Sequence, residues 1–376
     1  MAVSDAERRA WAYLSRVAEP PCPELAELVA VRGAVEVADM IRRRSEPEEL
    51  TGKVAARRES DYVDHDLEVL DRLSGRLITP EDDEWPYLSF VPFDNPKAND
   101  RVRRKGPMVF WAVGPARLDV VADRAAGIVG TRACSNYGEH VAAELAAGLA
   151  ERDVAVVSGG AYGIDGAAHR ATLASDGLTV AVLAGGVDVP YPSGHTALLQ
   201  RVAQTGLVLS EYPPGDRPTR YRFLTRNRLV AAISGTTVVV EAGLRSGAAN
   251  TAGWADKLGR VVCAVPGPVT AASSAGCHVL LRNGATLVDR ADHIVEIIGR
   301  MGELADEPDH PVTRLDALTP DQLLVYEALP ARGYRNLEQI CIGAALPPEK
   351  VLGPLTLLEV DGFVEKRDGR WKITPR

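Results

Sequence analysis

The sequence predicts an α/β protein built around a parallel β-sheet, and three features of residues 120–295 predict it. Short runs rich in Val, Ile and Leu alternate with longer runs of helical character. The short runs have no polar face, as expected of strands that helices cover on both sides. Most of them end in glycine, which is typical of a tight turn from strand to helix. We therefore expect a Rossmann-like core with a smaller domain at each end of the chain.

The expected strands of this core follow one another along the chain with a helix between neighbours. They are residues 127–129, 154–157, 179–183, 207–210, 238–241, 261–265 and 286–288. The first connecting helix is expected at 137–150, where Val141, Leu145 and Leu149 form one stripe. Ligands of such sheets bind at the carboxyl ends of the strands.

Residues 1–76 are expected to form a small helical domain of the SAM or helix-hairpin-helix kind. Trp11, Leu14 and Val17 stand at helical spacing, and Gly33 separates two further helices. Such modules sometimes bind the DNA backbone, but we favour the alternative of a helical cap on the next domain. That next domain, the Rossmann-like core, is placed at residues 77–299.

The end of the chain predicts a linker followed by a winged helix. Residues 300–318 are acidic and contain two prolines, which is typical of a linker. In residues 319–376 we expect helices at 320–329, 336–345 and 348–359 and a final hairpin. Asp368 and Gly369 predict a type I′ turn in that hairpin.

Composition excludes several classes of protein. The five cysteines form no CxxC pair, so we expect neither a disulfide framework nor a zinc site, and no metal is assigned. The longest apolar runs are too short for a membrane span, and the N-terminus lacks the apolar region of a signal peptide. We therefore expect a cytoplasmic protein that contacts no membrane.

The net charge of -8 does not exclude an anionic ligand, because the acidic excess lies outside the core. Residues 120–295 hold 15 Lys and Arg against 14 Asp and Glu. Glycines that follow five core strands would let backbone amides approach phosphates closely. These glycines are Gly130, Gly159 with Gly160, Gly185 with Gly186, Gly247 and Gly267. The P-loop and GxGxxG patterns are absent, so we expect neither ATP nor NAD and assign no cofactor.

The segment RPTRYRFLTRNR at 217–228 indicates a nucleic-acid ligand. It holds five arginines and no acid, with Tyr221 and Phe223 between the arginines. Arginines neutralise phosphates, and aromatic rings give bases a surface to stack on. We expect this run to form a loop beside the glycine-rich turns. A solvated helix face is the alternative interpretation.

Acidic side chains offer weaker evidence of chemistry. Asp165 and His169 are one helical turn apart, which suits acid–base chemistry or a metal, but a structural role is our preferred interpretation. Glu241, at the end of a strand, is a second candidate acid.

Taken in order, the core motifs resemble the DprA/Smf family of bacterial DNA-processing proteins. The motifs are IVGTR (128–132), VVSGGAYGIDGAAH (156–169), TVAVLAGGVDVPYP (179–192), LSEYPPG (209–215), RFLTRNRLVAAIS (222–234), VVVEAGLRSGAANTA (238–252), VCAVPG (262–267) and GCHVLLRNGATLV (276–288). The resemblance implies an extended Rossmann fold, binding of single-stranded DNA, homodimerisation and loading of the RecA recombinase, with no catalysis. It also implies phosphate contacts by Arg132 and an RNR element at 226–228.

The candidate DNA-binding residues are Arg132, Ser158, Gly159, Gly160, Arg220, Arg222, Phe223, Arg226, Asn227, Arg228, Gly247 and Gly267. Two other functions compete with this one. The first is a nucleotide-hydrolysing enzyme related to the phosphoribohydrolases, with Glu241 as its acid, although their PGGxGTxxE pattern is reduced here to Pro266-Gly267. The second is a module that senses a free nucleotide, which would need only one or two of the arginines.

Overall fold

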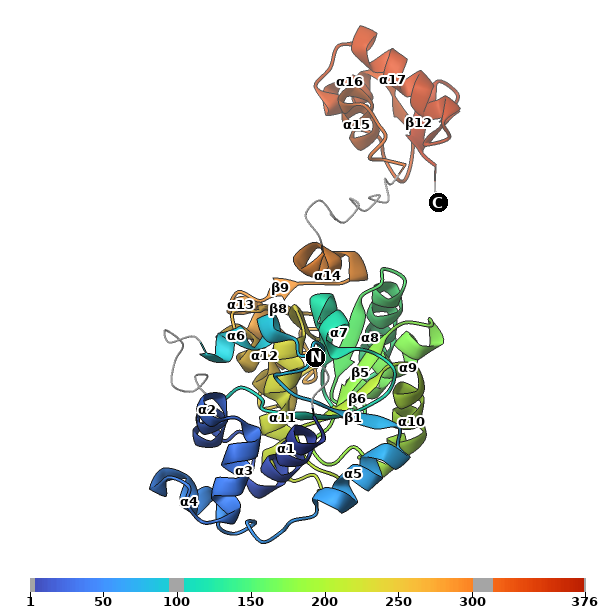
Figure 1. Cartoon of the computed structure of the whole chain (residues 1–376). Coiled ribbons are helices and arrows are strands. Elements are labelled where there is room, and N and C mark those ends of the chain that lie inside the picture. Colours follow the sequence, from blue (N-terminus) through green and yellow to red (C-terminus); the bar gives the residue numbers. More distant parts are fainter. Residues whose placement is uncertain (1–3, 95–104, 300–313, 375–376) are drawn as a thin grey trace. The chain divides into compact units, whose positions relative to one another are not determined.

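The computed structural model describes residues 4–94, 105–299 and 314–374. The chain divides into two compact units, Met1–Ala305 and Asp306–Arg376 (Figure 1). Residues 300–313, most of the predicted linker, lie outside the described residues.

The first unit contains fourteen α-helices, one short 3-10 helix and nine strands within its described residues. In chain order they are α1 (Asp5–Val17), α2 (Pro23–Arg32), α3 (Ala34–Arg42), α4 (Glu48–Val54), α5 (Val63–Arg72), β1 (Gly75–Ile78), α6 (Tyr87–Asp94), β2 (Phe110–Val113), α7 (Leu118–Asp123), β3 (Ala125–Val129), α8 (Asn136–Ala150), β4 (Ala155–Ser158), α9 (Ile164–Ala174), β5 (Thr179–Val182), η1 (Ser193–His195), α10 (Thr196–Thr205), β6 (Leu207–Ser210), α11 (Arg220–Ile233), β7 (Thr236–Val239), α12 (Gly247–Lys257), β8 (Val261–Ala264), α13 (Ala275–Arg282), β9 (Thr286–Leu287) and α14 (Ala291–Ile298).

The nine strands form one sheet in the order β1-β2-β6-β5-β4-β3-β7-β8-β9. In this order, the seven neighbouring strands β6-β5-β4-β3-β7-β8-β9 run parallel, which confirms the predicted core. β1 and β2 extend it by antiparallel pairing, so the sheet is mixed rather than wholly parallel. The chain lays down β4, β5 and β6 on one side of β3 and then β7, β8 and β9 on the other. The switch point of the sheet therefore lies between β3 and β7.

Helices cover both faces of the parallel strands (Figure 1). Side chains alternate between the faces along each strand, so Ala126 and Ile128 of β3 join a core with α8, α9 and α14. Ala125 and Val129 of the same strand join the opposite core, with α11 and α12. This two-sided burial explains why the strands are continuous apolar runs in the sequence.

The five N-terminal helices share a buried core with the antiparallel edge of the sheet. Trp11 and Leu14 of α1 belong to the same buried cluster as Trp111 of β2 and Leu199 of α10. The Trp111 indole Nε1 also donates to the Ser15 hydroxyl at 3.2 Å. The helical region is thus packed onto the sheet, as the cap interpretation requires.

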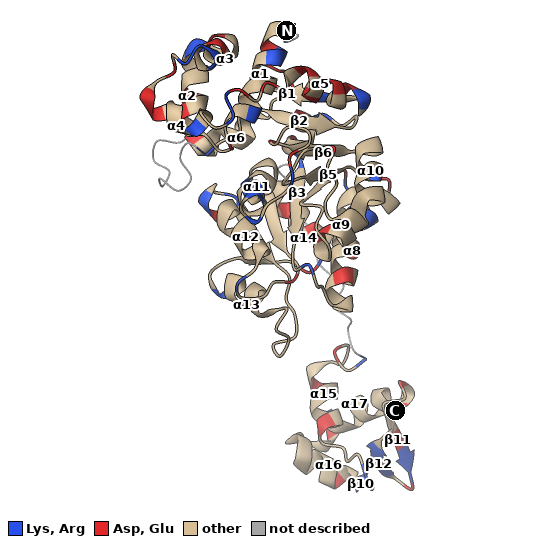
Figure 2. Cartoon of the chain, turned by 90° about the horizontal axis from the view of Figure 1, so that it is seen from below, with Lys and Arg blue, Asp and Glu red and all other residues tan. Residues whose placement is uncertain are grey.

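The second unit has the predicted order of three helices and a hairpin. Its elements are α15 (Pro320–Glu327), β10 (Arg335–Asn336), α16 (Leu337–Ala344), α17 (Pro348–Val360), β11 (Val364–Arg367) and β12 (Arg370–Ile373). Asp368 and Gly369 have φ of 49° and 70°, the left-handed pair that a type I′ turn requires. Parts of the ribbon of β11 and β12, where lysine and arginine stand, are blue in Figure 2. The designation of this unit as a winged helix stays a prediction.

Candidate functional site

A cavity of about 810 Å³ lies at the carboxyl ends of β3, β4 and β7. Its walls come from residues 129–132 after β3, the turn after β4, the first turns of α11 and the loop before α12. This position is the switch point of the sheet, where open α/β sheets bind their ligands.

Seven of the twelve predicted site residues line this cavity. They are Arg132, Gly159, Arg220, Phe223, Arg226, Asn227 and Gly247. They come from four separate stretches of the sequence, and only the fold brings them together.

The rim of the cavity combines an aromatic ring with exposed cations. Arg132 and Arg220 are exposed, and Phe223 is half-buried. The Arg132 guanidinium carbon lies 4.9 Å from the centre of the Phe223 ring, within cation–π range. The centre of the Tyr191 ring lies 5.4 Å from the centre of the Phe223 ring. The rim can therefore offer both positive charge and stacking surface.

The floor of the cavity is a buried arginine next to a buried acid. Arg226 is 4% exposed, and its Nη1 donates to the carbonyl oxygens of Gly159, at 2.6 Å, and of Val182. No described residue is a hydrogen-bond partner of its Nε. Burial lowers the pKa of Arg226 to about 10, against the opposing attraction of Asp165, so the side chain remains a cation at neutral pH. The floor thus places a positive charge beside the cavity, while Nε of Arg226 is itself buried from solvent.

Two glycines are required where the backbone approaches this floor. A side chain on Gly159 would bring its Cβ within 2.5 Å of the Arg226 guanidinium. Gly163 has φ of 74°, and its Cβ would lie 2.2 Å from the Thr131 carbonyl oxygen. Glycine at these positions keeps the β3 and β4 turns close together.

Arg228 lies away from the cavity. Its side chain is 1% exposed, and its two Nη atoms donate to the Glu211 carboxylate at 2.6 and 2.8 Å. Its Nε donates to the Lys105 carbonyl at 2.8 Å. In this structure Arg228 has no exposed surface with which to neutralise a phosphate, so its assignment to DNA has no support here.

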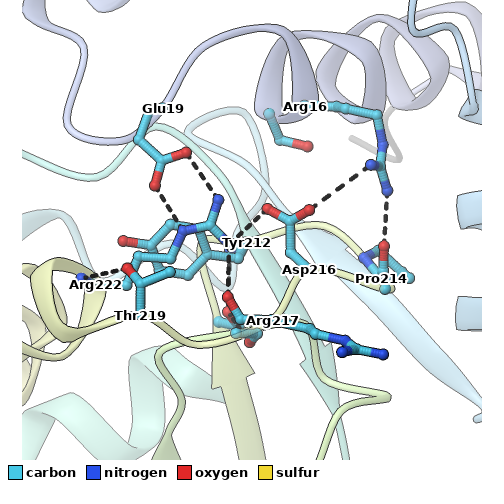
Figure 3. Close-up of polar contacts among 12 residues, drawn as sticks. Arg16, Glu19, Tyr212, Pro214, Asp216, Arg217, Thr219 and Arg222 are labelled. Atoms are coloured by element: carbon cyan, nitrogen blue, oxygen red, sulfur yellow. Dashed lines mark hydrogen bonds and ion pairs between the residues drawn. The ribbon is translucent and has the colours of Figure 1, made fainter. Parts of the chain in front are cut away.

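Arg222 also points away from the cavity and pairs with Glu19 of the N-terminal region (Figure 3). The segment from Arg220 onward is the start of α11, so the prediction of a loop over this run is wrong. A helix turns successive side chains in different directions, and the arginines of the run consequently have different surroundings.

The three remaining predicted residues do not line the cavity. The Ser158 hydroxyl is buried and donates to the Ile128 carbonyl at 2.6 Å. Gly160 is buried and has φ of 69°. The carbonyl of Gly267 is 3.0 Å from Nε2 of His278. These contacts stabilise the turns of the sheet edge.

Comparison with known proteins gives the same family as the motifs. Residues 76–299 match the family model of DNA recombination-mediator protein A. The chain belongs to this family, the DprA/Smf family. A putative DNA processing protein DprA of Mycobacterium tuberculosis is 64% identical over 369 residues, which cover 98% of this chain and 95% of that protein. DprA of Streptococcus pneumoniae is 40% identical over 222 residues, 58% of this chain and 76% of that protein.

Solved DprA structures share the fold. The X-ray structure of DprA from Streptococcus pneumoniae superposes with a TM-score of 0.63 at 28% identity, over 79% of this chain and 98% of that one. DprA from Helicobacter pylori gives a TM-score of 0.50 at 28% identity, over 58% of this chain and 94% of that one. The second structure was described for its unique single-stranded DNA binding mode.

The cavity of this DprA-family chain also contains residues that the sequence analysis missed. Arg245 lines it from the loop before α12, and Tyr191 and Thr219 line it as well. Arg245 was detectable, because it directly precedes the Ser246-Gly247 turn to which the sequence analysis assigns phosphate binding. Tyr191 carried no such signal, since only the fold brings it next to Phe223.

The two candidate acids differ in their surroundings. Asp165 lines the cavity, but its carboxylate accepts the backbone N–H groups of Gly159 and Ala161 at 3.1 and 3.4 Å. Glu241 is buried outside the cavity lining and accepts from the Ser135 and Ser273 hydroxyls at 2.6 and 3.0 Å. Both carboxylates therefore stabilise turns.

Neither metal nor membrane features appear in the part of the chain that the structure describes. No group of three or more His, Cys, Asp or Glu side chains is arranged to hold a metal ion there. None of the helices there is long and apolar enough to cross a membrane.

Proposed function

We propose that this DprA-family protein binds single-stranded DNA in the cavity at the switch point of its sheet. The observation that carries the proposal is the place of the Phe223 ring beside the exposed Arg132 and near the buried Arg226. Arginines neutralise phosphates, and an aromatic ring stacks on bases, which are accessible only when a strand is unpaired. The single-stranded DNA binding described for the Helicobacter pylori relative supports the same choice of ligand.

The cations of the cavity carry most of the expected phosphate contacts. Asp165 already occupies two backbone amides of the β4 turn, so these are not free for an anion. Arg132, Arg220 and Arg245 line the cavity, together with the N-terminus of α12 at Gly247. We expect binding that depends strongly on salt and little on base sequence, because such contacts read no base edges.

The wider role that we propose follows the family. The bound strand would be protected and passed to the RecA recombinase during transformation or recombination in the cytoplasm, by a homodimer of this chain. We propose no catalytic step, and the engagement of Glu241 with two serines supports this. Release of a free base or phosphate from a nucleoside monophosphate by the purified protein would favour the enzyme alternative instead.

The test is a salt titration of fluorescence anisotropy with a labelled single strand and with the matching duplex. The wild type should prefer the single strand. Arg132→Ala/Arg220→Ala should weaken binding and reduce the salt slope by about 0.7 for each phosphate that is no longer neutralised. Arg201→Ala/Arg282→Ala removes two exposed arginines outside the cavity and should change neither quantity. Equal affinity of the wild type for both ligands would contradict the proposal.

A further inference from the structure

The N-terminal helical region holds the segment that leads into the candidate DNA cavity. The carboxylate of Glu19, two residues beyond α1, accepts hydrogen bonds from Nε and Nη2 of Arg222 at 2.6 and 2.8 Å. Figure 3 shows this two-pronged contact from the first turn of α11 to the N-terminal region. The two residues are 203 positions apart in the sequence, so the contact joins separate parts of the fold.

Further polar contacts surround this ion pair. Asp216 lies 2.8 Å from the Arg222 guanidinium, and Arg57 donates to Glu19 at 2.7 Å. Arg16 of α1 donates to the carbonyl oxygen of Pro214 at 2.7 Å (Figure 3). The loop before α11 is thus held at its backbone and at the Asp216 side chain.

The Arg222 side of the ion pair is buried and the Glu19 side chain is 34% exposed, so the pair constrains the loop more strongly than a fully exposed pair would. Arg222 is buried and lies over the buried Tyr212 ring at 4.3 Å. Burial pushes the pKa of Glu19 upward, but hydrogen bonds from Arg222 and Arg57 outweigh it and leave that pKa below its usual value. Glu19 therefore remains a carboxylate at neutral pH and holds Arg222 in one direction.

The held segment supplies one wall of the cavity. Thr219 and Arg220 stand three and two residues before Arg222, Phe223 follows it, and all three line the cavity. The Thr219 hydroxyl accepts the backbone N–H of Arg222 at 3.3 Å and so caps α11. Fixing Arg222 consequently fixes the first turn of α11, from which Arg220 and Phe223 extend.

We infer that Glu19 and Asp216 are positioning residues for DNA binding, through which the N-terminal region orients the first turn of α11 toward the strand. This inference rests on the proposed function. Neither residue lines the cavity, so both would act through Arg222. Binding sites need such support, because small displacements of contacting groups reduce affinity.

The direction of the change in DNA affinity distinguishes a positioning role from simple electrostatic repulsion. Removing an acid near a basic cavity should strengthen DNA binding if the acid only repels phosphates. Freeing Arg222 to contact a phosphate should strengthen it too. A positioning role predicts the opposite, weaker binding, because the wall that carries Phe223 and Arg220 loses its fixed direction.

The experiment compares Glu19→Gln and Asp216→Asn with wild type in the full chain, with a labelled single strand as the probe. Each variant should weaken binding by roughly 2- to 30-fold, the usual size of such indirect effects. The salt slope should stay unchanged, since neither residue contacts phosphate. Glu59→Gln is the matched control, because Glu59 forms an exposed ion pair with Arg44 at 2.9 Å in the same region, and it should bind as wild type does.

A double-mutant cycle separates positioning from general destabilisation. In the Arg222→Gln background, Glu19→Gln should cause little further loss of affinity, because both substitutions break the same ion pair. Thermal unfolding of each variant identifies a temperature at which all of them are folded, and binding is compared there. If Glu19→Gln does not fold, Asp216→Asn tests the inference in its place. The inference would be overturned if folded Glu19→Gln or Asp216→Asn bound the strand as well as or better than the wild type, or if the losses in the cycle were additive. Arg132→Ala tests the proposed function independently of these outcomes. A wild type that binds no single strand would overturn both.

Discussion

Phe223 is the residue at which charge and stacking meet. Its ring centre lies 4.9 Å from the Arg132 guanidinium carbon, 5.4 Å from the centre of the Tyr191 ring and 5.9 Å from the Arg226 guanidinium carbon. A ring held by neighbours loses little freedom when a base stacks on it. Its contribution to binding should therefore be separable from that of the arginines around it.

Phe223→Ala should weaken single-strand binding by about 1–3 kcal/mol through the loss of one stacking surface. The salt slope should be nearly unchanged, since every phosphate keeps its cation. Tyr221→Ala is the matched control, because Tyr221 is 62% exposed and lies outside the cavity lining. A salt titration of each variant makes the comparison, and equal losses in both would place the stacking surface elsewhere.

Arg228→Ala should act on stability rather than on phosphate binding. The substitution leaves the Glu211 carboxylate buried without its bidentate partner, which typically costs about 3–5 kcal/mol. Urea unfolding should show this loss, while Arg282→Ala, at an exposed position, should show little. A stable variant with a reduced salt slope would restore Arg228 to the DNA contacts that the sequence analysis assigned to it.

The sequence predicts which residue types gather at the site better than it predicts their directions. Five arginines in twelve residues indicate an anionic ligand. Whether each one faces the cavity or the interior depends on its angle around α11 and on distant acids such as Glu19. No local pattern contains that information, so Arg222 and Arg226 look alike in the sequence.

At the scale of elements, α9 and β5 meet at a buried histidine. His169 Nδ1 lies 2.7 Å from the Thr179 hydroxyl oxygen, and that hydroxyl donates its only proton to the Val156 carbonyl at 2.8 Å. Nδ1 must therefore carry the proton, and Nε2 has no hydrogen-bond partner among the residues that the structure describes. Burial, aided by nearby cations, lowers the pKa of His169 to about 3, so the ring stays neutral and structural.

This histidine should make the protein less stable in acid. Below pH 6.5 the unfolded ring takes up a proton, whereas the folded ring stays neutral down to about pH 3, so stability falls as the pH falls between these values. The wild type should lose about 1.4 kcal/mol more per pH unit than His169→Gln over that range. Urea unfolding at several pH values measures the difference. The profile of His140→Gln, at a surface position, should follow the wild type, and parallel profiles for wild type and His169→Gln would refute the expectation.

Strand prediction succeeded for the parallel strands, where burial favours apolar residues, and failed for the antiparallel pair β1 and β2. The parallel strands consist mainly of apolar residues because helices cover both faces of most of them, and each was predicted to within two residues at either end. β1 has the sequence Gly-Arg-Leu-Ile, too short to show a period, and it was missed together with its antiparallel partner β2. β2 also pairs with β6, which lies nearly a hundred residues further along the chain. Local sequence patterns do not reveal such a distant partner.

At the scale of the whole molecule, the β9 end of the sheet suggests where two copies would meet. β9 is an edge strand, Leu287 on it is 49% exposed, and Val279 on α13 is 44% exposed. An open strand edge with apolar side chains is suited to an isologous contact with a second copy.

Light scattering of the wild type should therefore give the mass of a dimer at micromolar concentration. Val279→Asp/Leu287→Asp should give a monomer, because it would bury like charges at the contact. Val120→Asp, on the exposed side of α7, should leave the dimer intact. A strictly monomeric wild type would rule out the homodimer that we propose.

The second unit should contribute little to single-strand binding. Its core is separate from the cores of the first unit, so each has its own source of stability. Reading bases in a major groove needs several polar or basic side chains on one helix, and α17 offers only Lys350. Ile342 and Val360 are instead strongly exposed, which favours contact with a protein.

Deleting residues 311–376 should accordingly leave most of the affinity for a labelled single strand. The hairpin carries the cations Lys366, Arg367 and Arg370, which would contact phosphates only. Any loss of affinity caused by removing them should therefore disappear at high salt. Anisotropy at low and high salt distinguishes this loss from one in the cavity. If the deletion abolished binding while the cavity residues were intact and the first unit stayed folded, then the switch point would not be the principal DNA site.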